Sequence, residues 1–162
     1  MPPTNYSLDL TGTGSCASFN FRRTARAVTR LFDLAFQGCG IRSTQFSILV
    51  GVAKTQPTSI GALSELLIID RTTLTRSLRL LKKDGLLAIS ERSKMRQRFL
   101  TLTPKGEQLL ARAVPAWRAA QDRFVQNIGA EYWVNFRNEL ERLAHLTIEL
   151  ENSAPAPETI SA

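Results

Sequence analysis

Apolar side chains recur at steps of three and four residues along much of the chain, which is the spacing of one helix face. The pattern predicts helices over about 15–37, 43–54, 60–68, 71–83, 105–127 and 130–151. Two shorter runs, 86–91 and 98–103, are typical of strands, and the basic turn 92–96 between them predicts a hairpin. The ends, 1–14 and 153–162, are expected to be flexible. The fold class is therefore mainly α with a small β-hairpin.

Short polar residues mark the starts of the central helices. Asp70 suits the N-cap of helix 71–83, Ser59 that of helix 60–68, and Ser43 or Thr44 that of helix 43–54. Two leucine sets are expected in the core: Leu74, Leu78 and Leu81 on helix 71–83, and Leu63, Leu66 and Leu67 on helix 60–68. Pro115 lies inside the predicted helix 105–127 and is expected to kink or split it.

The order of a short helix, a capped helix and a basic hairpin predicts a winged helix-turn-helix. In that motif, helix 60–68 braces helix 71–83, which presents threonine and arginine side chains to base edges in the DNA major groove. The cationic hairpin tip would contact the minor groove or phosphates. The candidate DNA-binding residues are Arg71, Thr72, Thr73, Thr75, Arg76 and Arg79 on the helix, and Arg92, Lys94, Arg96 and Arg98 on the hairpin. The alternative is an ordinary solvated basic surface.

The charge distribution agrees with a nucleic-acid partner. The chain of 162 residues has a net charge of +7, and residues 70–105 alone carry ten basic and three acidic side chains, a local net charge of +7. Such a local surplus is expected of a phosphate-binding surface, although solvated basic faces are also common.

Other features argue against further classes of protein. The N-terminus lacks the pattern of a secretory signal and no run is apolar enough to span a bilayer, so we expect a cytoplasmic protein with no membrane partner. His145 is the single histidine, and neither a phosphate-binding glycine loop nor a catalytic triad is evident. We therefore expect neither an enzyme, nor a metal site, nor a cofactor.

Four segments resemble the MarR family of bacterial transcriptional regulators. The run 69–86 is similar to the recognition-helix signature of that family, and 98–106 is similar to its second wing strand with the start of the next helix. The segments 42–49 and 20–32 resemble its second and first helices. The resemblance covers roughly residues 16–150. One departure is Lys94, which stands where the family usually has an aspartate that braces the wing arginine, here Arg96.

The resemblance implies a homodimer. In that family the first and last two helices of two chains intertwine, so residues 15–42 and 105–152 would form a helical dimerisation domain beside a winged helix-turn-helix DNA-binding domain, 43–104. Two recognition helices would then lie about 34–36 Å apart on a palindromic site. The dimerisation helices also carry more apolar surface than one winged domain could cover. The candidate interface residues are Phe21, Trp117, Phe124, Trp133, Phe136 and Leu140.

The predicted function is that of a sequence-specific, double-stranded-DNA-binding transcriptional regulator, a ligand-responsive repressor. The family often binds small aromatic or phenolic carboxylates, which Arg22, Arg23 or Arg26 could pair with. These arginines could equally pair with the acidic last helix. Two alternatives remain open: a thiol-based redox-sensing regulator acting through Cys16 or Cys39, which are otherwise two free thiols, and an architectural protein that binds DNA without sequence preference.

Overall fold

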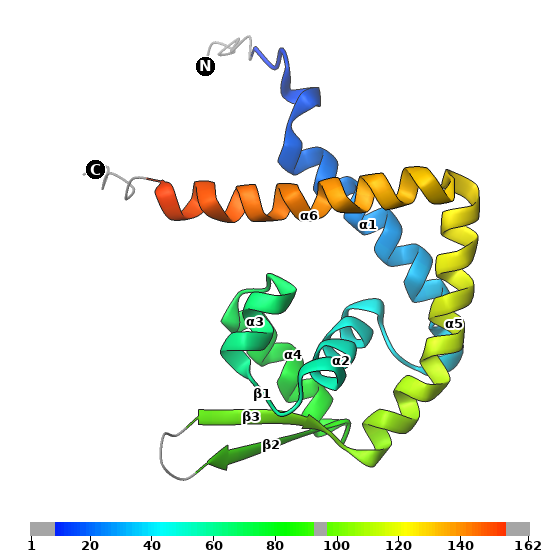
Figure 1. The fold of residues 1–162 in the computed structure, drawn as a ribbon, viewed down its shortest axis with the longest axis vertical. Helices are drawn as coiled ribbons and strands as arrows, with labels where there is room; N and C mark the ends of the chain where they lie inside the picture. Colours follow the sequence, from blue (N-terminus) through cyan, green and yellow to red (C-terminus); the bar gives the residue numbers. More distant parts are fainter. Residues whose placement is uncertain (1–8, 93–96, 155–162) are drawn as a thin grey trace, which may run out of the picture. The chain divides into compact units, whose positions relative to one another are not determined.

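The computed structural model describes residues 9–92 and 97–154, and these divide into two compact units (Figure 1). The first unit runs to Ala120 and the second begins at Gln121. Among the described residues, no helix is both long and apolar enough to cross a membrane.

The first unit holds the elements that the hydrophobic pattern predicted, with small shifts at their ends. After a short 3-10 turn (Thr13–Ser15) come α1 (Ala17–Ala35), a second 3-10 turn (Gln37–Cys39), α2 (Ser43–Thr55), β1 (Thr58–Ser59) and α3 (Ile60–Leu67). They are followed by α4 (Arg71–Lys83), β2 (Leu87–Arg92), β3 (Gln97–Leu102) and the first part of α5 (Pro104–Ile128).

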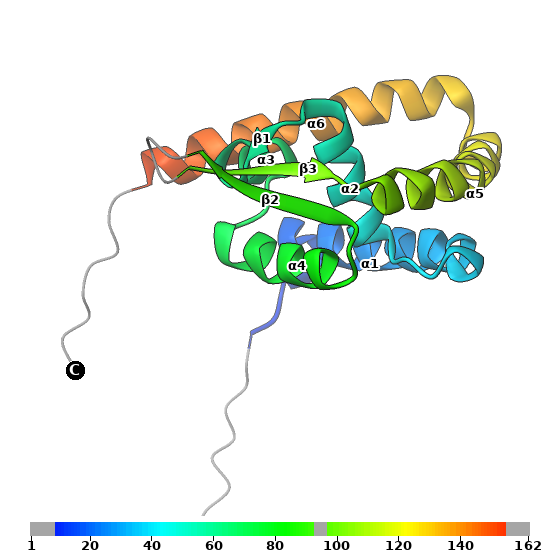
Figure 2. The same cartoon turned by 90° about the horizontal axis from the view of Figure 1, so that it is seen from below.

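The sheet has three antiparallel strands in the order β1-β3-β2, one more than the hairpin predicted from sequence. β2 and β3 pair from Leu87 with Leu102 to Arg92 with Gln97, while β1 adds only the pairs Thr58–Leu100 and Ser59–Phe99. Helix α2 packs against β3 and α4 against β2 (Figure 2). The extra strand therefore joins the start of α3 to the hairpin.

One hydrophobic core binds the first unit together. It takes side chains from α2, α3, α4, the sheet and the start of α5, and its fully buried members include Leu49, Leu63, Leu74, Leu78 and Leu100. Gly106, in the first turn of α5, lies so close to the Leu86 carbonyl that a Cβ atom at this position would collide with it. This glycine allows α5 to begin directly against the hairpin.

Three local expectations were wrong. The N-cap of α2 is Arg42, not Ser43 or Thr44, and the Gln45 side chain accepts a 3.0 Å hydrogen bond from the Arg42 backbone N–H. Leu66 is 54% exposed, because it lines the hollow beside α1 and α2 and does not enter the core. The split expected at Pro115 does not occur, because α5 is one helix of 25 residues, while a kink at this position stays a prediction.

The second unit contains the end of α5 and helix α6 (Ala130–Ser153), joined at Gly129. Two aromatic pairs lie within it. Phe124 and Trp133 meet edge to face with ring centroids 5.5 Å apart, and Tyr132 stacks on Phe136 at 5.8 Å. No residue of α6, all of which is described, is buried within this chain.

Candidate nucleic-acid interface

Helix α4 begins at the cap that its sequence predicts. The Asp70 carboxylate accepts a 2.8 Å hydrogen bond from the backbone N–H of Thr73. Hydrogen bonds from the Thr73 side chain and backbone lower the pKa of Asp70 below its ordinary value. The carboxylate is therefore held in its charged form at the positive end of the helix, where it stabilises the first turn.

The buried leucines of α4 fix which side of the helix faces solvent. Leu74, Leu78 and Leu81 are buried in the core, as predicted. Because residues on one helix face are separated by three or four positions, the remaining side chains lie away from the core. Of the predicted DNA-binding set on α4, Thr75 is half-buried, and the others are exposed: Arg71, Thr72, Thr73, Arg76 and Arg79.

A tight turn positions α4 relative to α3. The Ser59 side chain caps α3 by accepting a 3.1 Å hydrogen bond from the Ala62 N–H. The Ser64 hydroxyl donates a 2.6 Å bond to the Ile69 carbonyl, and Ile68 adopts a left-handed conformation with φ 50°. Sequence reasoning missed Ser64, whose position three residues before the end of α3 gives no helix-capping signal.

Arg71 and Arg98 line a common cavity at the start of α3. Its volume is about 570 Å³, and the other lining residues are Ser59, Ile60, Gly61, Ala62 and Glu65. Arg98 is exposed on β3. Helix α4 and strand β3 thus each place an arginine on one hollow, which the sequence did not reveal because these residues are 27 positions apart.

The remaining residues of the predicted wing set are Arg92, Lys94 and Arg96. Arg92 is the last residue of β2, and the structure describes its backbone alone. Lys94 and Arg96 lie outside the described residues. The expected contacts of these three side chains with DNA stay predictions.

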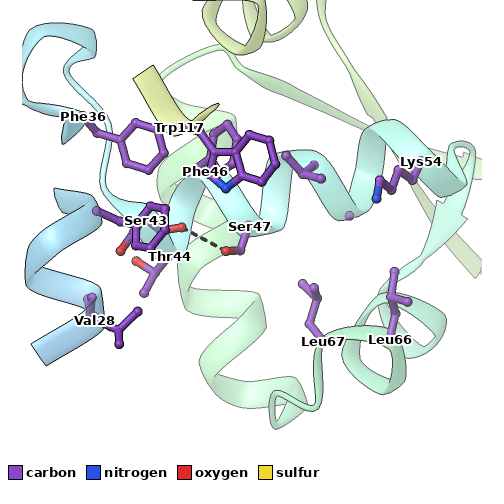
Figure 3. A pocket seen from close by; sticks show the side chains of 14 residues that line it. Val28, Phe36, Ser43, Thr44, Phe46, Ser47, Lys54, Leu66, Leu67 and Trp117 are labelled. Carbon is purple, nitrogen blue, oxygen red and sulfur yellow. Dashed lines mark hydrogen bonds between the residues drawn. The ribbon is translucent and has the colours of Figure 1, made fainter. Parts of the chain in front are cut away.

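A second hollow of about 540 Å³ lies between α1, α2, α3 and the first part of α5 (Figure 3). Its apolar floor includes Phe46 and Trp117, whose rings stack with centroids 6.3 Å apart. Polar groups lie at both ends of it: the Ser47 hydroxyl donates a 3.0 Å bond to the Ser43 carbonyl near α1, and Lys54 lies toward the other end of α2. An aromatic ring with an anionic substituent matches such a lining.

The three arginines predicted to bind an effector do not line this hollow. Arg22, Arg23 and Arg26 are all exposed on the first half of α1, whereas the α1 residues at the hollow are Val28, Thr29 and Phe32. Lys54 is the cation among the lining residues.

Cys16 and Cys39 are both free thiols. Cys16 is exposed and Cys39 half-buried, with its Sγ atom 3.8 Å from the Arg112 carbonyl oxygen. His145 is exposed, and no cluster of three potential metal ligands occurs within residues 9–92 and 97–154.

The predicted interface residues remain accessible in one chain. Phe21, Trp117 and Phe136 are exposed, and Phe124, Trp133 and Leu140 are half-buried. Large apolar side chains rarely stay in water in such numbers unless a partner covers them.

Comparison with known proteins places this geometry in a family. No protein-family model matches the chain. The M. tuberculosis transcriptional regulator MosR, solved in complex with DNA, is 30% identical, with a TM-score of 0.76 over 83% of this chain and 97% of MosR. A MarR-family regulator from Rhodococcus sp. RHA1 has a TM-score of 0.71 at 18% identity, over 83% of this chain and 96% of that one. The chain belongs to the MarR family.

Further relatives are also transcriptional regulators. CouR from Rhodococcus jostii RHA1, solved on a 23-mer DNA duplex, has a TM-score of 0.74 at 22% identity, over 85% of this chain and 98% of CouR. HTH-type transcriptional regulators of Staphylococcus aureus strains are 38% identical over 66 residues, 40% of this chain, and the match spans 45% of their length. The winged helix-turn-helix fold is confirmed, and the prediction of a DNA-binding transcriptional regulator is confirmed at the level of the family.

Proposed function

We propose that this MarR-family chain is a homodimeric repressor that binds a palindromic DNA site sequence-specifically and responds to a small ligand. The observation that carries the proposal is the exposure of Thr72, Arg76 and Arg79 on the solvent face of α4. This helix is capped at its start and held against the core by three buried leucines. Arginine can bind guanine in a bidentate manner and threonine can contact base edges, so this face can distinguish sequences.

The proposed domains are the two that the sequence predicts. Residues 43–104 would form the DNA-binding domain, and residues 15–42 with 105–152 would form the dimerisation domain. Support comes from α6, none of whose residues is buried within one chain although it carries Tyr132, Val134 and Phe136. A second copy of the chain would cover these side chains and set two α4 helices about one DNA turn apart, roughly 34–36 Å.

We place the effector in the hollow between α1 and α2 rather than at Arg22, Arg23 and Arg26. A structure of CouR holds p-coumaroyl-CoA, an aromatic acyl ligand. In this chain, Phe46 and Trp117 offer an aromatic floor and Lys54 a cation at the rim. A small aromatic or phenolic carboxylate would place its ring on the floor and its carboxylate near Lys54.

The proposed role needs no catalytic group, cofactor or metal, and a DNA-binding regulator of a bacterial family would act in the cytoplasm. The competing architectural role differs in one measurable respect, because it requires no sequence preference. The redox alternative is favoured by no observation beyond the two free thiols themselves.

A mobility-shift competition tests the proposal. The labelled duplex is the site that the protein enriches from a pool of random double-stranded sequences. An excess of unlabelled enriched duplex should remove the shift, whereas the same excess of a shuffled duplex should leave it at physiological salt, because specific binding exceeds non-specific binding by about 10³-fold or more. Equal competition by both duplexes would contradict sequence-specific regulation and favour the architectural role.

A further inference from the structure

The hydroxyl group of Thr75 is already engaged within α4. Its Oγ1 atom donates a 2.6 Å hydrogen bond to the carbonyl of Arg71, one turn earlier. A threonine hydroxyl has a single proton, so this bond uses the only donor of the side chain. A base acceptor in the major groove would have to compete with an existing short bond.

The same bond fixes the orientation of the Thr75 side chain. A threonine in a helix occupies one of two rotamers, selected by the bond between its hydroxyl and the preceding turn. With Oγ1 held against Arg71, the methyl group is the part of the side chain that the backbone does not engage. Thr75 is half-buried, and Arg71 and Arg79, four residues away on either side, are exposed on the same side of the helix.

Thr73 differs from Thr75 in how it contacts the helix start. Its backbone N–H donates a 2.8 Å hydrogen bond to the Asp70 carboxylate, and its side chain contributes most to the lowered pKa of that group. Thr75 is the threonine of α4 whose hydroxyl donates a hydrogen bond to the helix backbone. Base hydrogen bonding from this helix then falls to residues other than Thr75, above all Thr72 and the exposed arginines.

We propose that Thr75 is a specificity-determining residue that recognises thymine through a methyl–methyl contact. This inference rests on the proposed function and names how one residue of the DNA-binding face reads sequence. In the major groove thymine alone carries a C5-methyl group, and an apolar contact with it is an established form of direct readout. The expected preference is for a T·A pair at one position of each half-site.

Uracil substitution in the DNA measures this contact directly. In the duplex enriched by the wild-type protein, each thymine in turn is replaced by deoxyuridine, which removes the C5-methyl group and keeps every hydrogen-bonding group. Binding is measured by fluorescence anisotropy. One thymine per half-site should lose about three- to fivefold in affinity for the wild type, the change expected from burial of about one methyl group.

Two substitutions separate the methyl group of Thr75 from its hydroxyl. Thr75→Ser keeps the hydroxyl and its bond to Arg71 but removes the methyl, so this variant should bind thymine and uracil at that position with equal affinity. Thr75→Val keeps the methyl and has nearly the same shape, so it should retain the three- to fivefold discrimination. Thr147 supplies the matched control, because its hydroxyl donates an equivalent 2.7 Å bond to the Leu143 carbonyl in α6. Thr147→Val and Thr147→Ser report what loss of such a bond, or of such a methyl group, does to Tm.

The outcomes distinguish this inference from the proposed function. Thymine–uracil discrimination that survives in Thr75→Ser would show that another residue contacts the thymine methyl, and it would overturn the assignment to Thr75. Discrimination that is lost in Thr75→Val, while the change in Tm matches that of Thr147→Val, would overturn the methyl contact as well. A wild type that is insensitive to uracil at every position would also overturn it, while specific binding stands. A wild type that enriches no sequence would overturn the proposed function and this inference together.

Discussion

The Oδ1 atom of Asp33, near the end of α1, accepts a 2.7 Å hydrogen bond from the backbone N–H of Ser43 at the start of α2. The Arg42 guanidinium lies 3.2 Å from the other carboxylate oxygen. One side chain of α1 thus satisfies a free N–H group of the next helix and ties α1 to the start of α2.

The Asp33 carboxylate should make stability depend on pH. The hydrogen bond from the Ser43 backbone, with smaller contributions from the Ser43 side chain and Arg42, lowers the pKa of Asp33 below its ordinary value of 3.8. A lowered pKa means stabilisation that is present above pH 3.8 and lost as the pH falls through the folded-state value. Asp33→Asn should lower the free energy of unfolding at pH 7 by about 0.5–1 kcal/mol. The effect is small because water screens the charge of this partly exposed carboxylate.

Urea denaturation between pH 7 and pH 3 measures this effect. The difference between wild type and Asp33→Asn should shrink toward pH 3, because the wild-type carboxylate becomes protonated. Asp122→Asn, at an exposed position of α5, is the matched control. A constant difference across the pH range would show that the charge of Asp33 contributes nothing.

Arg76 should contribute to sequence discrimination. It is exposed on α4 on the side opposite the buried leucines. Arg76→Ala should weaken binding to the enriched duplex by about 1–3 kcal/mol and relax the preference at one position per half-site. Arg118→Ala, which removes an exposed arginine of α5, should leave the sequence preference unchanged. An equal loss on every duplex sequence would mean that Arg76 contacts phosphate alone.

The aromatic residues of α6 should support the dimer to different degrees. Trp133 meets Phe124 of its own chain, so Trp133→Ala should weaken both the fold of the second unit and the dimer. Phe136 is 38% exposed and stacks within its own chain only on Tyr132, which is itself exposed, so Phe136→Ala leaves the Phe124–Trp133 pair in place and acts more on the partner contact. For Phe136→Ala, sedimentation equilibrium should show a dimer dissociation constant raised about 30-fold over the wild type, equivalent to about 2 kcal/mol.

Arg137→Ala, at the neighbouring exposed position, supplies the control for Phe136→Ala. The dimer constant should change little in this variant. If Phe136→Ala dimerised as tightly as the wild type, the assignment of Phe136 to the interface would be refuted.

Lys54 should determine the charge preference of the effector. The chain has two tryptophans, so in a Trp133→Phe background the fluorescence of Trp117 reports on the hollow. We expect 4-hydroxybenzoate to quench this fluorescence and Lys54→Met to weaken its binding about three- to tenfold, a modest change because Lys54 is exposed.

The neutral analogue 4-hydroxybenzamide is the matched ligand. Its binding should be the same in both proteins, because it carries no charge for Lys54 to pair with. Equal weakening of the acid and the amide would show that Lys54 shapes the hollow without pairing with an anion.

The sequence predicted α4 and its surroundings well because the signals there are local. Asp70 caps the helix three residues before the N–H group that it binds, and Leu74, Leu78 and Leu81 follow the helical period. Both features lie within one or two turns of chain, where periodicity and capping rules apply. The predicted DNA-binding face follows from these two local features.

The missed features depend on contacts between distant residues. β1 is two residues long and forms only because β3 lies beside it. The start of α2 is fixed by Asp33, ten residues earlier, and the hollow shared by Arg71 and Arg98 requires the hairpin to lie against α3. No periodicity in the sequence encodes such pairings, so the structure was needed to find them.

A hydroxyl-radical footprint of the wild-type protein on its enriched duplex tests the central claim most directly. Two α4 helices related by a twofold axis should protect two equivalent patches, with centres about 10–10.5 base pairs apart and symmetric about the middle of the site. A single protected patch, or uniform weak protection along the duplex, would contradict a dimer that reads a palindrome with its exposed threonine and arginine side chains.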